Sequence, residues 1–92
     1  MKKCVKIVLH IPVIKGFLQD VVQEQARRLG LEGVAQLQLP SEVKIVAFGA
    51  KEAIDAFIDL LHKETSKHGV AQVEVEPFIK DKDYRGIFRI IE

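Results

Sequence analysis

The hydrophobic pattern of this chain changes its period twice, from the alternation of a strand to the spacing of a helix, and this limits the fold more than any other feature. Val5, Ile7 and Leu9 alternate with more polar residues near the start. A period of two in a run rich in β-branched residues predicts a strand. Over residues 17–29 the apolar residues recur at helical spacing, and Gly30 follows where helices commonly end. The first third of the chain therefore predicts a strand followed by a helix.

The rest of the chain repeats this change of period. Two short strands are predicted over residues 35–39 and 43–48, and a helix that ends before Gly69 follows them. A fourth strand is predicted over residues 72–76 and a short closing strand over residues 87–91. The buried stripe of the second helix is predicted to comprise Ile54, Phe57, Ile58 and Leu61.

This order of elements predicts an α+β fold. Two strand–helix–strand halves give the ferredoxin-like βαββαβ sandwich, in which an antiparallel sheet of four or five strands carries two helices on one face. A chain of 92 residues suits one domain, which we expect to span 1–92. The predicted core comprises Val5, Ile7, Leu9, Val22, Leu29, Leu37, Ile45, Ile54, Phe57, Ile58, Leu61, Val73 and Val75.

Composition and charge narrow the classes of function. The formal net charge is only +1, so neither nucleic acid nor a membrane surface is expected as a partner. The single cysteine, Cys4, cannot form an internal disulfide and is predicted to be a small strand residue. His10, His62 and His68 lack the spacing of metal ligands, so no metal site is predicted, and no cofactor is expected. The apolar stretch at the start is too interrupted for a signal peptide or a spanning helix, and we expect a cytoplasmic protein.

Four local stretches narrow the fold to a family. These are Leu29–Val34 at the end of the first helix, Val43–Ala47, Lys51–Phe57 and Val73–Glu76. Together, with the spacing from Gly33 to Gly49, they resemble the acylphosphatase family over nearly the whole chain. The resemblance implies a hydrolase of acyl phosphates with an anion-binding loop between the first strand and the first helix.

The loop itself departs from the family pattern. The resemblance implies a glycine-rich run whose backbone N–H groups hold a phosphate and whose arginine grips the phosphate oxygens. Here the stretch reads Pro12-Val13-Ile14-Lys15-Gly16-Phe17-Leu18-Gln19. If Gly16-Phe17 is held in register, Leu18 takes the arginine position; if the helix is held in register, Gln19 takes it. Lys15, Gly16 and Phe17 remain as candidates for binding an anion.

A second functional position also departs. The resemblance implies an asparagine near the start of the second strand, which holds the attacking water. Counting from Gly33 places Leu37 there, whereas a bulge of one residue that aligns Leu39-Pro40 with the family would place Gln38 there. An additional methylene in Gln38 would misplace its amide, and a shift near 1 Å can cost about a hundredfold in rate.

Three other polar residues are candidates for a site. His10 lies near the end of the first strand, where it is either an acid or base or a polar edge residue. Glu74 and Glu76 share one strand face, and carboxylates there are either an acid–base pair or solvated surface.

Three hypotheses of function follow. The first is an acylphosphatase-like domain that has lost hydrolysis, a pseudoenzyme that binds an anionic small molecule or a protein partner. The second is a weak acylphosphatase that uses Lys15 or Gln19 for the phosphate and Gln38 for the water. The third is a small ferredoxin-like module for ligand binding or oligomerisation. Self-association as a homodimer would use a sheet edge or the open sheet face, where Val8, Val46 and Phe48 are predicted to lie.

Overall fold

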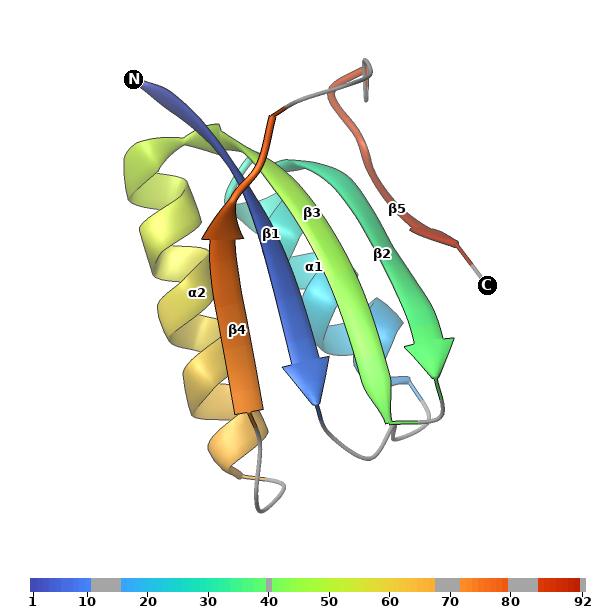
Figure 1. Ribbon diagram of the computed structural model, residues 1–92. Helices are drawn as coiled ribbons and strands as arrows, with labels where there is room; N and C mark the ends of the chain where they lie inside the picture. The colour runs from blue at the N-terminus through green and yellow to red at the C-terminus, as the bar shows by residue number, and fades with distance from the viewer. Residues whose placement is uncertain (11–15, 40, 68–71, 80–84, 92) are drawn as a thin grey trace.

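The computed structural model describes the chain except for residues 11–15, 40, 68–71, 80–84 and 92, and the side chain of Leu39. The strands and helices alternate as the sequence predicts (Figure 1). In chain order they are β1 (Lys2–His10), the π-helix η1 (Leu18–Gln23), α1 (Glu24–Arg28), β2 (Glu32–Leu39), β3 (Glu42–Ala50), α2 (Lys51–Ser66), β4 (Gln72–Pro77) and β5 (Phe88–Ile91). None of the described helices is long and apolar enough to cross a membrane.

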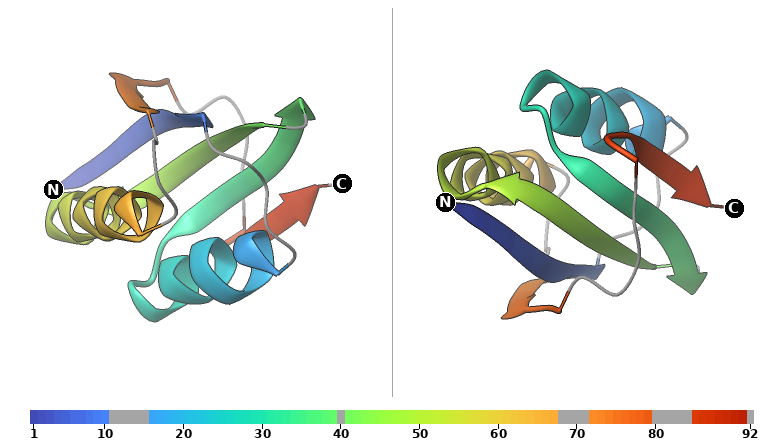
Figure 2. Two further views of the ribbon diagram at one scale, coloured as in Figure 1. Left: turned by 90° about the horizontal axis from the view of Figure 1, so that it is seen from below. Right: turned by 90° about the horizontal axis from the view of Figure 1, so that it is seen from above.

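In the described part of the chain the strands form one sheet in the order β4-β1-β3-β2-β5. The helical segments lie on one face of it, as predicted (Figure 2). The β1–β3, β1–β4 and β2–β3 pairs are antiparallel, whereas β5 runs parallel to β2, so the sheet is mixed and not wholly antiparallel. The difference arises because the chain passes from β4 at one edge to the opposite edge, where β5 enters in the direction of β2 (Figure 1).

The core lies between the sheet and the helices. Val5, Ile7 and Leu9 are each at most 1% exposed and face the helices, as the alternation predicts. Phe88 is also fully buried, and its ring meets that of Phe57 edge to face, with centroids 6.2 Å apart. The remaining predicted core residues that are buried are Val22, Ile45, Ile54 and Leu61, and those packed against the core in part are Leu29, Ile58 and Val73.

Two predicted core residues are exposed. Leu37 and Val75 are each 42% exposed. Leu37 lies where a bulge interrupts the pairing of β2 with β3, and Val75 lies on the edge strand β4, which has a described neighbour on one side only. Alternation predicts the face of a strand correctly here, but it contains no information on how much of that face the helices cover.

The open face of the sheet is less apolar than predicted. Val46 is only 4% exposed, so it is not presented to solvent. It lies on the central strand β3, between Lys6 on β1 and Val34 on β2, and these neighbours flank it on both sides. Phe48 is partly covered too, with the Lys2 ammonium 5.8 Å from the centre of its ring. Of the three apolar residues predicted on this face, Val46 is thus buried, and Phe48 and Val8 are partly buried.

Candidate functional site

The candidate residues gather at one end of the sheet. Because β1 and β2 each run antiparallel to β3, they point the same way and end at the same edge of the fold (Figure 1). His10 ends β1 there, and Leu37 and Gln38 lie near the end of β2. Gly16 precedes the helical segment, whereas Lys15, the candidate cation of the loop, lies outside the described residues.

Gly16 forms the turn that begins the helical segment. Its φ angle is +85°, a region that favours glycine. The carbonyl oxygen of Gly16 accepts a hydrogen bond from the Asp20 N–H at 2.7 Å. A Cβ atom at Gly16 would lie 2.9 Å from Asp20 Oδ2, so a carboxylate stands directly beside this turn. The sequence analysis did not identify this carboxylate beside Gly16, an anion-binding candidate.

The residues after Gly16 divide between core and solvent. Phe17 is 4% exposed and Leu18 is 9% exposed, and both belong to the core. Gln19 is exposed. Of the two residues that compete for the arginine position, the structure thus turns Leu18 inward and leaves Gln19 at the surface.

The helix begins with a π-helical turn, which the sequence analysis missed. η1 covers Leu18–Gln23, and α1 continues it from Glu24. A π-helical turn closes its hydrogen bond over one more residue than an α-helical turn, and such turns are frequent at functional sites. Gln23, at the end of η1, donates from Nε2 to the carbonyl oxygen of Phe88 at 3.1 Å, which joins the π-helix to β5.

The end of β2 contains one extra residue relative to its partner strand β3. Leu37 pairs with Val43 and Leu39 pairs with Glu42, so Gln38 is an extra residue, a β-bulge. A bulge of one residue is therefore present, but it comes after Leu37, and the pairing from Gly33 to Leu37 is uninterrupted.

The amide of Gln38 lies on the open face of the sheet. Its Nε2 donates to Gln36 Oε1 at 3.1 Å. Gln36 pairs with Lys44, next to the buried Ala35–Ile45 pair, so its side chain is on the face away from the helices. Gln38 is thus turned to the open face, whereas Leu37 belongs to the helix-facing side.

His10 lies between two carboxylates on the open face. Its Nε2 contacts Glu74 Oε2 of β4, and its Nδ1 is 4.0 Å from Glu42 Oε1 of β3. The sequence analysis singled out His10 and Glu74 but not Glu42, which only the strand register brings to the same place. In the described part of the chain, no group of three or more such side chains could hold a metal ion.

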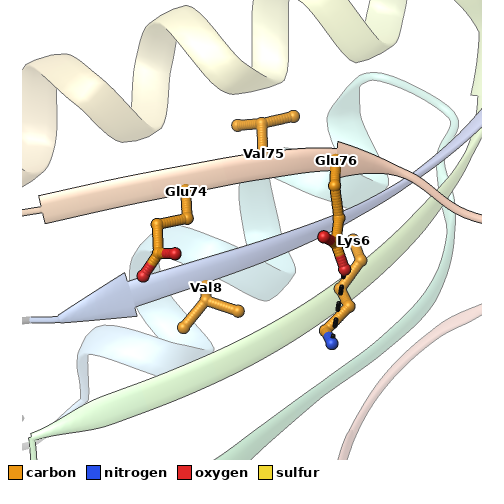
Figure 3. Close-up of a pocket in the computed structure, with 5 residues that line it drawn as sticks. All are labelled: Lys6, Val8, Glu74, Val75 and Glu76. Atoms are coloured by element: carbon orange, nitrogen blue, oxygen red, sulfur yellow. Dashed lines mark ion pairs between the residues drawn. The ribbon is translucent and has the colours of Figure 1, made fainter.

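A shallow hollow lies farther along the same face, between β1 and β4. Its volume is about 200 Å³, and Lys6, Val8, Glu74, Val75 and Glu76 line it. Figure 3 shows Glu74, Val8 and Lys6 projecting to one side of the two strands and Val75 to the other. Lys6 Nζ is 3.5 Å from Glu76 Oε1. The hollow is therefore a polar surface feature of the open face, on the side of the sheet opposite the helices.

Comparison with known proteins agrees with this architecture. The acylphosphatase family model matches residues 14–90. An acylphosphatase of Dehalococcoides mccartyi strain CBDB1 is 36% identical over 72 residues, which cover 77% of this chain and 79% of that protein.

Two solved structures share the fold. An acylphosphatase from Coxiella burnetii superposes with a TM-score of 0.83 at 23% identity, covering 98% of this chain and 93% of that one. The acylphosphatase from Bacillus subtilis has a TM-score of 0.73 at 18% identity, with both chains covered completely. The match of the family model over most of the sequence, together with the identity to the Dehalococcoides protein, shows that this chain belongs to the acylphosphatase family.

Proposed function

We propose that this protein is a slow hydrolase of carboxyl–phosphate bonds, which binds the phosphate of an acyl phosphate at the turn around Gly16. Family membership and the name of the relative that is 36% identical favour retained hydrolysis over its complete loss. The observation that carries the proposal is the left-handed Gly16 at φ +85°, which leads directly into the helical segment. A turn of this kind supplies backbone N–H groups to an anion.

The chemistry that remains is weaker than that of an arginine site. The exposed amide of Gln19 is a neutral donor beside the turn, and Lys15 supplies a positive charge without the two-pronged geometry of a guanidinium. Loss of one fixed donor typically costs about 10²–10³ in kcat. We therefore expect turnover below about 10 per second, an ordinary enzymatic rate.

The two one-residue irregularities support one assignment of the site. We propose that Leu18 stands at the arginine position. The register taken from Gly16-Phe17 and the register taken from the helix differ by one residue. The wider turn of η1 accommodates one extra residue, so both registers are consistent with Leu18 at that position. Likewise, Leu37 stands at the asparagine position, because the bulge at Gln38 accounts for the second discrepancy. Both positions are then apolar, which fits slow turnover.

A second candidate function is a binding domain without hydrolysis. Three observations favour it: Leu18 is buried, the Gln38 amide is turned to the open face, and the Asp20 carboxylate stands beside Gly16. A carboxylate next to an anion site opposes the anion by like-charge repulsion.

One assay separates the two candidates. Hydrolysis of acetyl phosphate would be measured for the unmodified protein and for Lys15→Ala, with the uncatalysed reaction as baseline. Slow turnover that Lys15→Ala lowers supports the hydrolase. Turnover indistinguishable from the baseline contradicts it and leaves the binding domain.

The same assay tests the assignment of the site. Leu18→Arg is expected to raise turnover more than Gln19→Arg does. Circular dichroism is the control for folding, because Leu18→Arg places a charged side chain at a buried position. A gain from Gln19→Arg alone would contradict the assignment.

A further inference from the structure

The outer edge of β4 presents backbone groups that no described strand pairs with. β4 is at one end of the sheet order, with β1 on its inner side. The Phe78 N–H donates to the Cys4 carbonyl at 3.1 Å, which fixes the phase of hydrogen bonding along this pair. In an antiparallel pair only every second residue of a strand forms hydrogen bonds with its partner strand. Since Phe78 bonds to β1, so do Glu76 and Glu74, and the N–H and C=O groups of Val73 and Val75 point outward. An edge of this kind is a template for another extended chain.

The side chains along this edge are acidic on the open face. Glu74 and Glu76 have side chains that are 57% and 63% exposed. Val75, which points to the opposite face, is 42% exposed. A strand added here would therefore meet carboxylates at every second position on one face and an apolar residue on the other.

The hollow next to this edge suits a long cationic side chain. Val8 provides an apolar wall, and the carboxylates of Glu74 and Glu76 stand at its sides (Figure 3). Lysine and arginine bury their aliphatic stems along apolar surface while the charged head stays with polar partners. Lys6 Nζ is 3.5 Å from Glu76 Oε1, and His10 Nε2 contacts Glu74 Oε2. Each contact uses one oxygen of its carboxylate, and the second oxygen can accept from a further cation.

A second copy of this chain fits the edge poorly. If Val73 or Val75 of one copy pairs antiparallel with either residue of another, Glu74 stands opposite Gln72, Glu74 or Glu76 of that copy. Like charges directly opposite one another destabilise a strand pair. Charge therefore disfavours the registers that place Glu74 opposite Glu74 or Glu76 of a second copy.

We propose that the β4 edge binds an extended segment of another protein, with lysine or arginine at every second position and β-branched residues between them. The segment adds a strand beside β4, held by the outward backbone groups of Val73 and Val75. Its cations lie on the open face, over Glu74 and Glu76. This interaction is separate from the turn at Gly16 and does not depend on hydrolysis.

The test uses a capped peptide of alternating lysine and valine, about seven residues long, titrated into the isotopically labelled protein. Resonance shifts should be centred on the amides of Val73 and Val75. Glu74→Gln combined with Glu76→Gln should weaken binding about tenfold, whereas the matched change Glu52→Gln with Asp59→Asn on α2 should leave it unchanged. Val75→Pro should abolish binding without breaking the β1 ladder, because it removes an outward N–H.

Four outcomes overturn the proposal. They are equal binding by a peptide with glutamate in place of lysine, unchanged affinity in the Glu74/Glu76 double variant, shifts centred away from β4, and no binding at millimolar peptide. A dimer in sedimentation that Val75→Pro dissociates would also overturn it, since the occupant would then be a second copy. Thermal unfolding of each variant shows that loss of binding is not loss of fold.

Discussion

The contact between Phe57 and Phe88 joins two elements that lie far apart in the sequence. Phe57 is on α2 and Phe88 is on β5, and both side chains are fully buried. Periodicity predicted the burial of Phe57, because three other apolar residues share its helix face. Phe88 belongs to a strand of only four residues, a stretch too short for a reliable period.

We expect Phe57→Ala to lower the free energy of unfolding by about 3–5 kcal/mol, because it removes a whole ring from a packed core. Urea denaturation followed by circular dichroism measures this. Asp59→Ala, an exposed change on the same helix, should stay within about 0.5 kcal/mol of the unmodified protein. A loss below about 1 kcal/mol for Phe57→Ala would contradict the packing described for α2.

Two glycines near the start of β2 should respond differently to the same change. Gly30 has φ +71° and open space where a Cβ would lie, whereas at Gly33, with φ +146°, a Cβ would stand 1.9 Å from the Val46 carbonyl oxygen. Gly30→Ala should cost about 1–2 kcal/mol, from the left-handed conformation alone. Gly33→Ala should cost clearly more, because the central strand must also move. Equal unfolding midpoints for the two variants would contradict this.

The N-terminal turn of α2 contains a charge cluster that depends on pH. The Lys51 ammonium is 2.8 Å from Asp55 Oδ2, and Lys3 of β1 is 3.4 Å from Oδ1. The hydrogen bond from Lys51 lowers the pKa of Asp55 from its usual 3.8. The same bond raises the pKa of Lys51 from its usual 10.5. The cluster joins the start of the helix to the first strand.

The sign of the pH effect follows from these shifts. A carboxyl with a lowered pKa adds stability above about pH 3.8 and loses it as the pH falls through its folded-state pKa. We therefore expect Asp55→Asn to destabilise the protein near neutral pH and to match the unmodified protein at low pH. Urea midpoints over this pH range measure the difference. Asp59→Asn is the control, and a constant gap between Asp55→Asn and the unmodified protein down to low pH would contradict the prediction.

The elements show which parts of the fold can be predicted from a pattern. Alternation and helical spacing depend on burial, which acts on each residue, so β1, β3 and α2 were predicted with nearly the right bounds. The π-helix and the bulge at Gln38 depend on how hydrogen bonds close around one extra residue. The sequence left the bulge as one of two alternatives and did not indicate the π-helix. The direction of β5 depends on the route of the chain after β4, which no local pattern contains.

Some features of the candidate site could be predicted from the sequence, and others arise only from contacts in the fold. The resemblance of the loop to the family made Gly16 a candidate for binding an anion, and this stays a prediction. The Asp20 carboxylate beside it and the pairing of His10 with Glu42 arise from contacts across turns and strands. Neither contact has a signal in the spacing of residues along the chain.

At the scale of the whole molecule, the sheet depends on pairs of residues far apart in the sequence. Lys2 pairs with Ala50, and Val5 pairs with Pro77. Such pairs must close long loops before they contribute stability, which slows folding. We expect refolding from urea in milliseconds to seconds, measured by stopped-flow circular dichroism. Complete refolding within microseconds would contradict this topology.

The position of β1 between β4 and β3 also matters while the protein is being synthesised. This strand leaves the ribosome before its two neighbours, β3 and β4, which are synthesised much later. During that interval its row of Val5, Ile7 and Leu9 has no sheet to enter and is a hazard for aggregation of the nascent chain. Lys6 alternates with that row and Lys3 directly precedes it, so we expect their charge to oppose pairing of two unfinished chains through their first strands.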